Sequence, residues 1–266
     1  MADSVLYQVS DGLATITINR PGAMNALDIE AKVALRDTLE EASSDPSVRA
    51  VLLTATGRAF CVGQDLKEHI GLLETARENG SGTLMNTVRE HYNPIIRALT
   101  TMPKPVVAGV NGVAAGAGLG FVLAADHRVV ADSATFTTAF SGIALTADSG
   151  ISWTLPRLVG QSRAADLLLF PRSFSAQEAQ EWGIANEVVP AGELAERATA
   201  VARKLAEGPT LAYAAIKESL AHASGHSLAE TLLKEEELQA RAGASEDHAI
   251  AVAAFLAKER PVYRGR

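Results

Sequence analysis

The chain has 266 residues, of which 47% are hydrophobic, 21% charged and 5% aromatic, and its formal net charge is −7. These values are typical of one large globular α/β domain, or of one domain with an appendage. The acidic balance and the lack of a basic tract argue against nucleic-acid binding. The single cysteine excludes an internal disulfide. With no signal-peptide pattern and no apolar run near about 18 residues, we expect a cytoplasmic chain without a membrane span.

The N-terminal third predicts a hairpin and then a helix. Apolar and polar residues alternate from Val5 to Asn19 around the turn pair Asp11-Gly12, which is a strong hairpin signal. Asp28 is placed to cap a helix with an apolar face. Residues 48–54 then predict a buried strand, and residues 71–83, rich in Gly, Ser, Asn and Glu, predict a mobile surface segment.

The middle and end of the chain alternate strand and helix signals. A helix is expected over 88–99, with a possible kink at Pro94, and a buried strand over 105–110. A helix follows near 119–125, a strand over 126–130, a helix over 151–158 and a short strand within 183–189. The rest is helical, over 209–223 and 228–242. This order predicts parallel crossovers, with a core at 1–195 and a helical C-terminal module at 196–266.

Two segments of small residues, 59–66 and 111–120, each follow one of the predicted buried strands. The second opens a helix, and the first turn of a helix offers unpaired N–H groups at the positive end of its dipole. Two such loops can form an oxyanion hole. The alternatives are tight strand-to-helix turns, or a dinucleotide fingerprint. The fingerprint does not fit, because Gly116, Gly118 and Gly120 have the wrong spacing and Asp126 follows too soon.

Four stretches, in order over more than half of the chain, resemble the enoyl-CoA hydratase/isomerase (crotonase) superfamily: NRPGAMNALD, GRAFCVGQDLKE, KPVVAGVNGVAAGAGLG and SWTLPRLVG. The resemblance implies an α/β crotonase (ClpP/crotonase-like) spiral of ββα units with a helical C-terminal module for oligomerisation. It also implies an acyl-CoA substrate, no cofactor beyond the coenzyme A carried by that substrate, and a homotrimer or dimer of trimers. The six histidines show no metal-binding spacing such as H-E-x-x-H, so we expect no metal. It does not fix the reaction.

Matched to the family pattern, the oxyanion donors are the backbone N–H groups of Gln64 and Ala117; most relatives have glycine at the latter position. The two glutamates that hold water in the family's hydratases fall at Gly120 and Phe140. Neither of these residues can move a proton, so the ordinary hydratase mechanism is in doubt.

A different carboxylate, Asp148, lies in a stretch that resembles the branch of ring-epoxide isomerases of phenylacetyl-CoA breakdown (PaaG type), with which Δ3,Δ2-enoyl-CoA isomerase activity is also associated. There an aspartate at this position faces the acyl chain, and burial would raise its pKa toward that of a useful base. The alternative is that Asp148 caps the next helix. The family's dehalogenases of aromatic acyl-CoAs use an aspartate at this position as a nucleophile, together with a tryptophan and a histidine. In this chain those two positions hold Phe140 and Asn93, so dehalogenation is disfavoured.

The remaining predicted contacts concern coenzyme A and the acyl group. In the family the adenine lies against the first loop through backbone contacts, and a basic residue meets the phosphates. The candidates are therefore Arg20, Lys67 and Lys258 for phosphate, and Cys61, Val62, Gly63, Asp65, Leu66, Gly116 and Phe140 for the rest of the substrate. Cys61 has the alternative role of a nucleophile, but without an indicated partner a buried structural thiol is favoured.

The sequence therefore predicts an acyl-CoA enzyme, an enoyl-CoA or ring-epoxide acyl-CoA isomerase in which Asp148 moves the proton. Two alternatives are an enoyl-CoA hydratase with weak or no hydration activity, and a non-catalytic acyl-CoA-binding or scaffold protein. The identity of the acyl chain is not readable, because residues 71–89, expected to line its tunnel, carry no clear pattern.

Overall fold

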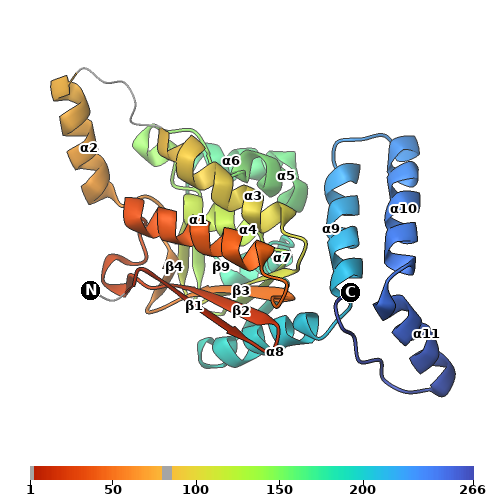
Figure 1. Ribbon diagram of the computed structural model, residues 1–266. Coiled ribbons are helices and arrows are strands. Elements are labelled where there is room, and N and C mark those ends of the chain that lie inside the picture. The colour runs from red at the N-terminus through yellow and green to blue at the C-terminus, as the bar shows by residue number, and fades with distance from the viewer. Residues whose placement is uncertain (1–2, 80–85) are drawn as a thin grey trace.

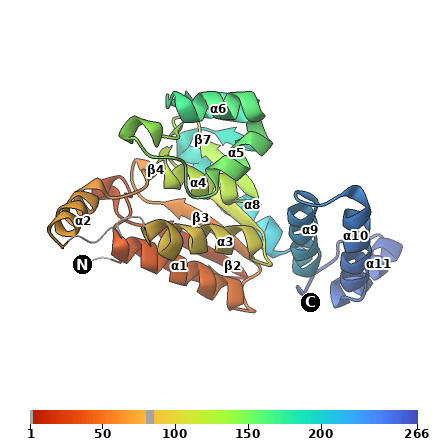
Figure 2. The same ribbon diagram turned by 90° about the horizontal axis from the view of Figure 1, so that it is seen from above.

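Two β-sheets form the centre of the protein in a computed structural model that describes residues 3–79 and 86–266 (Figures 1 and 2). The larger sheet has the strand order β1-β2-β3-β5-β7-β10, in which β1 and β2 are antiparallel and the other neighbours are parallel. The smaller sheet has the order β4-β6-β8-β9, and only β9 runs antiparallel to its neighbour. The strands are β1 (Val5–Ser10), β2 (Leu13–Ile18), β3 (Ala50–Ala55), β4 (Ala59–Cys61), β5 (Val106–Val110), β6 (Val113–Ala115), β7 (His127–Ala131), β8 (Thr135–Thr137), β9 (Phe174–Ser175) and β10 (Glu187–Val189).

The predicted hairpin is confirmed as β1 and β2. Its two turn residues, Asp11 and Gly12, have φ angles of 52° and 79°, the left-handed conformation that a two-residue hairpin turn requires. Strand β2 then pairs with β3 in parallel, from Leu13 opposite Ala50 to Ile18 opposite Ala55. The hairpin therefore extends the parallel sheet at one edge.

Three successive ββα units build the rest of the core. In each, the first strand enters the large sheet, the second enters the small sheet, and a helix follows: β3-β4-α2, β5-β6-α4 and β7-β8-α5. The second strands, β4, β6 and β8, are parallel neighbours of only three residues each. Their carboxyl ends therefore meet at one edge of the small sheet, where such folds bind ligands.

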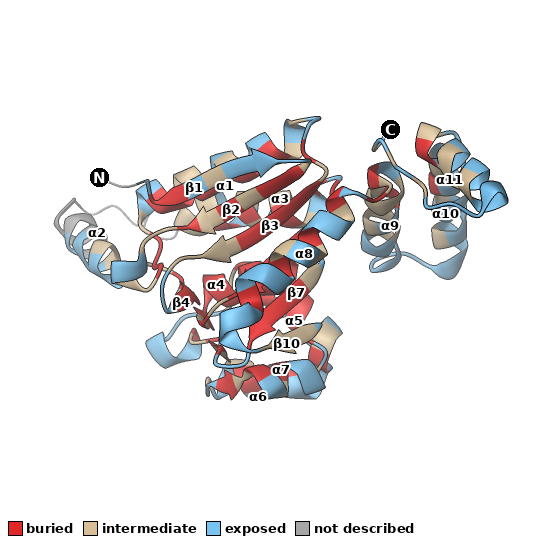
Figure 3. Ribbon diagram, turned by 90° about the horizontal axis from the view of Figure 1, so that it is seen from below, coloured by how far each residue is buried: buried red, intermediate tan, exposed pale blue. Residues whose placement is uncertain are grey.

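Helices cover both faces of the large sheet. Figure 1 shows α1, α3 and α4 above it, and Figure 3 shows α8 lying across the other face. Asp28 caps α1 as predicted, with its Oδ1 accepting from the Ala31 N–H at 2.9 Å. The helices are α1 (Ile29–Ser44), α2 (Leu66–Asn79), the π-helix η2 (Val88–Tyr92), α3 (Asn93–Thr101), α4 (Ala117–Ala124), α5 (Ile151–Val159), α6 (Gln161–Leu169), α7 (Ala176–Glu181), α8 (Leu194–Ala206), α9 (Thr210–Ala223), α10 (Leu228–Gly243) and α11 (Glu246–Ala257), with 3-10 turns at Pro21–Ala23, Ser141–Ile143 and Ala191–Glu193.

Helices α9, α10 and α11 form an arm that stands away from the sheets in both views (Figures 1 and 2). A partly buried ion pair joins the arm to the core, because Lys217 Nζ of α9 lies 2.7 Å from Asp126 Oδ2. The division expected between residues 195 and 196 falls inside α8, whose buried alanines pack on the large sheet. By its packing α8 belongs with the core, and the arm begins near Thr210.

The segment expected to be a mobile part of the surface is helical over the part that the structure describes. Residues 71–79 continue helix α2, which Asp65 caps through the N–H groups of Lys67 and Glu68, and Gly71 and Glu74 are exposed. Residues 80–83 of that prediction lie outside the described residues. Within the described chain, no helix is long and apolar enough to cross a bilayer.

Candidate active site

A cavity of about 410 Å³ lies where the three ββα units meet. The loop after β4 contributes Gln64, the loop after β6 contributes Ala117, and the loop after β8 contributes Asp148. Residues far apart in the sequence thus meet because their loops leave neighbouring parallel strands. Its other walls are mostly apolar: Ala26, Val62, Gly63, Leu66, Tyr92, Gly116, Thr138, Ala139, Phe140, Ile143 and Leu145.

The backbone N–H groups of Gln64 and Ala117 are available to a ligand. Neither has a hydrogen-bond acceptor among the residues that the structure describes. Ala117 is the first residue of α4, where an unpaired N–H and the positive helix end coincide. The two loops touch, because a Cβ placed on Gly63 would lie 3.4 Å from the Ala117 nitrogen. An oxygen atom between the loops could therefore accept both N–H groups, as an oxyanion hole requires.

Glycines bring these two loops together. A Cβ on Gly118 would lie 2.1 Å from the Cys61 carbonyl oxygen, and a Cβ on Gly112 would lie 2.1 Å from that of Arg58. No real side chain tolerates such contacts. Gly116 has a φ of 52° and a ψ of −124°, a conformation that only glycine adopts readily. The glycines of the predicted motif therefore have a packing role, and this packing leaves the N–H groups of Gln64 and Ala117 unpaired next to the cavity.

Asp148 does not cap the helix that follows it. The N-cap of α5 is Gly150, and no side chain hydrogen-bonds that helix end. The Asp148 side chain lines the cavity, and its Oδ1 accepts a hydrogen bond of 2.8 Å from the Ser149 hydroxyl. Desolvation by burial raises the pKa of Asp148, and the Ser149 hydrogen bond offsets part of this rise. The carboxyl group is therefore oriented and made more basic than an exposed aspartate.

The two positions expected to hold hydratase glutamates carry no acid, and one of them has no room for any side chain. A Cβ on Gly120 would lie 2.5 Å from Ser149 Cβ and 2.7 Å from Ser149 O. The loop that carries Asp148 thus fills the space next to Gly120. Phe140, at the second position, presents an aromatic ring to the cavity.

Tyr92 belongs to the site but was not predicted from the sequence. Its side chain is 2% exposed, it lines the cavity, and its hydroxyl donates to Gln64 Oε1 at 2.8 Å. In sequence it is one aromatic residue in a helical stretch, with no flanking motif. Tyr92 is the last residue of the π-helix η2, which leads directly into α3. Hydrophobic periodicity does not predict a π-helix, so the position of Tyr92 could not be expected from the sequence.

The predicted substrate-binding residues divide into two groups. Val62, Gly63, Leu66, Gly116 and Phe140 line the cavity. The others, Arg20, Cys61, Asp65, Lys67 and Lys258, do not line it.

Arg20 forms ion pairs with Asp28 at 2.6 Å and Asp65 at 3.2 Å, so its charge is already neutralised. Cys61 is fully buried, and burial raises the pKa of its thiol to about 12, which makes it unsuited to nucleophilic attack. Lys67 is exposed in the first turn of α2, and Lys258 is the C-cap residue of α11 in the arm and does not line the cavity.

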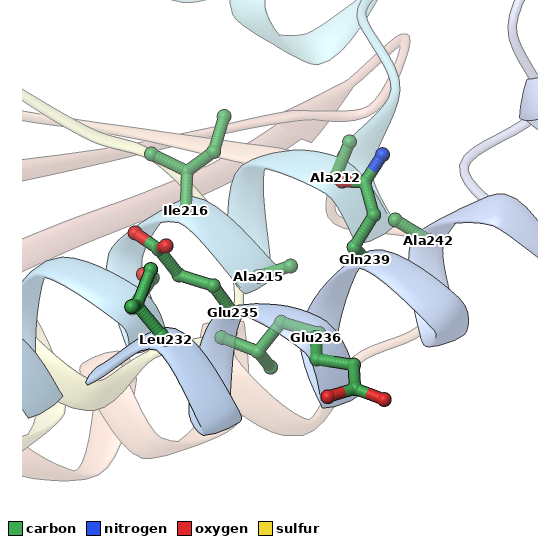
Figure 4. A pocket seen from close by; sticks show the side chains of 10 residues that line it. Ala212, Ala215, Ile216, Leu232, Glu235, Glu236, Gln239 and Ala242 are labelled. Atoms are coloured by element: carbon green, nitrogen blue, oxygen red, sulfur yellow. The ribbon is translucent and has the colours of Figure 1, made fainter. Parts of the chain in front are cut away.

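A larger cavity, of about 610 Å³, lies between α9 and α10 (Figure 4). Six of its ten lining residues are apolar (Ala212, Ala215, Ile216, Leu232, Leu238 and Ala242), and the others are Ser219, Glu235, Glu236 and Gln239. Its two described acids, Glu235 and Glu236, are exposed, unlike the partly buried Asp148 of the smaller cavity. Across the described residues, no group of three or more His, Cys, Asp or Glu side chains could hold a metal ion.

The spiral of ββα units and the paired N–H groups fit the family that the sequence resembles, and comparison with known proteins identifies the same family. The family model for enoyl-CoA hydratase/isomerase matches residues 8–266, so the chain belongs to this family of enzymes. The chain is 39% identical to the 1,2-epoxyphenylacetyl-CoA isomerase of Escherichia coli (strain K12), over 100% of both chains. It is 41% identical to a probable enoyl-CoA hydratase of Rhodobacter capsulatus, over 99% of this chain and 98% of the other.

Among solved structures, the chain is similar to a putative enoyl-CoA hydratase/isomerase from Mycobacterium abscessus. The TM-score is 0.93 at 47% identity, with 98% of this chain and 100% of that chain covered. The predicted crotonase fold is thereby confirmed.

Proposed function

We propose that this protein is an enoyl-CoA isomerase in which Asp148 carries the proton and the N–H groups of Gln64 and Ala117 hold the thioester oxygen. The observation that supports it most is that the described residues of the cavity wall include one carboxylate, on an oriented and desolvated side chain, at the edge where the unpaired N–H groups lie. Isomerisation needs one group that removes and returns a proton, whereas hydration in this family needs two acids.

The reaction would proceed in two balanced steps. Asp148 takes a proton from C2 of a 3-enoyl-CoA, and the electron pair moves through the thioester to its oxygen, giving a dienolate. The two N–H groups stabilise that oxygen more strongly as its charge develops. The carboxylic acid of Asp148 then returns the proton at C4, and the double bond lies between C2 and C3. The product is a 2-enoyl-CoA.

A ring-epoxide acyl-CoA is the second candidate substrate. The full-length similarity to the Escherichia coli 1,2-epoxyphenylacetyl-CoA isomerase favours it. Isomerisation of a ring-epoxide acyl-CoA would belong to phenylacetate catabolism, and isomerisation of a 3-enoyl-CoA would belong to fatty acid metabolism. No cofactor is needed for either reaction beyond the coenzyme A of the substrate, and we expect both in the cytoplasm.

We also propose that the arm assembles the protein into a homotrimer or a dimer of trimers. The arm exposes large apolar side chains, with Phe255 82% and Leu256 76% exposed, and such residues mark protein–protein contacts where they form patches. Sedimentation of the purified protein tests this, and a monomer at micromolar concentration would contradict it.

The purified protein should convert a 3-enoyl-CoA to a 2-enoyl-CoA and should hydrate crotonyl-CoA negligibly. Both reactions are followed by the absorbance of the conjugated thioester, and the ring epoxide is offered in parallel. A hydration rate close to that of a dedicated hydratase, in a preparation free of host hydratase, would exclude the mechanism. Binding of acyl-CoA without turnover of either isomerase substrate would favour the non-catalytic alternative.

A further inference from the structure

Among the described residues, two hydrogen bonds between side chains involve the wall of the cavity. One joins Ser149 to Asp148, and the other joins Tyr92 to Gln64. The Tyr92 hydroxyl donates to Gln64 Oε1 at 2.8 Å, and burial raises the pKa of this phenol, so it stays a donor at any working pH. Its acceptor belongs to the same residue whose backbone N–H is unpaired.

The loop that carries Gln64 is held on both sides of this residue but not at its own peptide N–H. Leu27 donates its N–H to the Gly63 carbonyl at 2.8 Å and accepts the N–H of Asp65 at 3.0 Å. The Gly63 carbonyl and the Gln64 N–H belong to one planar peptide, so the Leu27 bond already restrains that plane. Gly63 itself has a φ of 83°, a conformation that glycine adopts readily. The bond from Tyr92 to the Gln64 side chain adds a second anchor, on the side-chain side of the Gln64 Cα.

Tyr92 is itself held by buried polar groups. Lys32 of α1 is 1% exposed, and its ammonium lies 5.6 Å from the centre of the Tyr92 ring and 3.1 Å from Thr87 Oγ1. Thr87 Oγ1 also lies 3.1 Å from His91 Nδ1. These contacts fix the π-helix η2, which ends at Tyr92. Because π-turns are rare and are frequent at functional sites, their presence here favours a role for the residue that they orient.

We propose that Tyr92 is a positioning residue of the oxyanion hole: its hydrogen bond to the Gln64 side chain acts together with the two Leu27 bonds to fix the direction of the Gln64 backbone N–H. The proposal rests on the proposed function, because it assigns that N–H to the thioester oxygen. Tyr92 acts through Gln64, so its contribution appears as the negative charge develops on that oxygen. Its loss should lower kcat more than it changes KM.

The first test is Tyr92→Phe, which removes the hydroxyl and keeps the ring. We expect kcat to fall roughly 10-fold and KM to change less than about twofold, in line with one hydrogen bond lost from a buried partner. The matched control is Tyr7→Phe, because the Tyr7 hydroxyl is buried without a partner and lies on β1, outside the cavity. That control should leave kcat unchanged.

A spectroscopic readout separates positioning from a structural role. Bound 4-(N,N-dimethylamino)cinnamoyl-CoA should absorb at longer wavelength than the free compound, because hydrogen bonds to its carbonyl polarise the conjugated chain. Tyr92→Phe should reduce this red shift, and Gln64→Leu should reduce it to a similar extent. The double variant should show no further loss in red shift or kcat, since both changes remove one interaction.

The outcomes are distinguishable. Additive losses in the double variant, or a full red shift in Tyr92→Phe, would overturn the positioning role while leaving the oxyanion hole in place. A wild-type protein that binds the probe without any red shift would overturn the oxyanion hole, and the positioning role with it. If Tyr92→Phe fails to fold, Gln64→Leu reports on the same hydrogen bond from its other partner, and an unchanged kcat and red shift there would overturn the proposal.

Discussion

The proposed site has two parts that are built differently, and we name them the backbone end and the carboxylate end. The backbone end consists of the unpaired N–H groups of Gln64 and Ala117, and the close approach of Gly118 to Cys61 holds their loops together. The carboxylate end is the side chain of Asp148, which accepts a hydrogen bond from Ser149 on a loop with left-handed residues at Ala139, Ala144 and Ser149. We expect the backbone end to tolerate a change of its own side chains but not of its glycine neighbours, whereas the carboxylate end should depend on one residue's identity.

Gly118→Ala should have the largest effect, because it breaks the packing that forms the backbone end. The new methyl group would lie 2.1 Å from the Cys61 carbonyl oxygen, in rigid backbone, so the two loops would have to separate. We expect loss of activity together with a strongly lowered melting temperature. Gly192→Ala is the control, since nothing lies within 4 Å of its new methyl group. Equal melting temperatures for the two variants would show that the loops are not packed as described.

Ala117→Pro removes one donor of the backbone end and keeps the rest. Proline is accepted in the first turn of a helix, so the fold should survive. Loss of the N–H should cost roughly 3–4 kcal/mol of transition-state stabilisation, measured as kcat/KM. Ala117→Gly keeps the N–H and should keep most activity. Intact turnover in a folded proline variant, or equal losses in both variants, would exclude this N–H as a donor.

Asp148→Asn tests the carboxylate end alone. It should lower isomerase turnover by at least ~100-fold, the usual effect of losing a general base, with acyl-CoA binding retained. Burial raises the pKa of Asp148 in the folded state, so its contribution to stability is full below the unfolded pKa and is lost as pH rises through the folded pKa. The asparagine variant should therefore be at least as stable as wild type at neutral pH. Unchanged turnover, or a clear loss of stability at pH 7, would point to a structural role.

The pH dependence should report the carboxylate end and not the backbone end. The base acts in its ionised form, so kcat/KM should rise with pH through the pKa of Asp148, which burial holds above the ordinary value for aspartate. Backbone N–H groups do not titrate, and Ala117→Gly should give the same profile as wild type. An acidic limb at the ordinary aspartate value would show that Asp148 is solvated in the free enzyme.

Some features of the protein follow from the sequence alone. The hairpin at Asp11-Gly12, the cap at Asp28 and the strands β5 and β7 depend on local rules, because turn conformation, helix capping and apolar runs act over a few residues. The similarity of four stretches to one family also identified the fold, which structural comparison confirms. The glycines marked both loops of the backbone end, since close backbone approach leaves a compositional trace.

Other features required the tertiary structure. The second sheet has strands of two or three residues, too short for any periodic signal, yet these strands set the edge where Gln64, Ala117 and Asp148 meet. Whether Asp148 caps a helix or faces the cavity depends on the turn at Ser149 and Gly150. The local sequence is compatible with both arrangements, so it cannot decide between them. Tyr92 enters the site through a π-turn and its bond to Gln64, 28 positions away in sequence. Such contacts arise from packing between distant segments, and no local pattern encodes them.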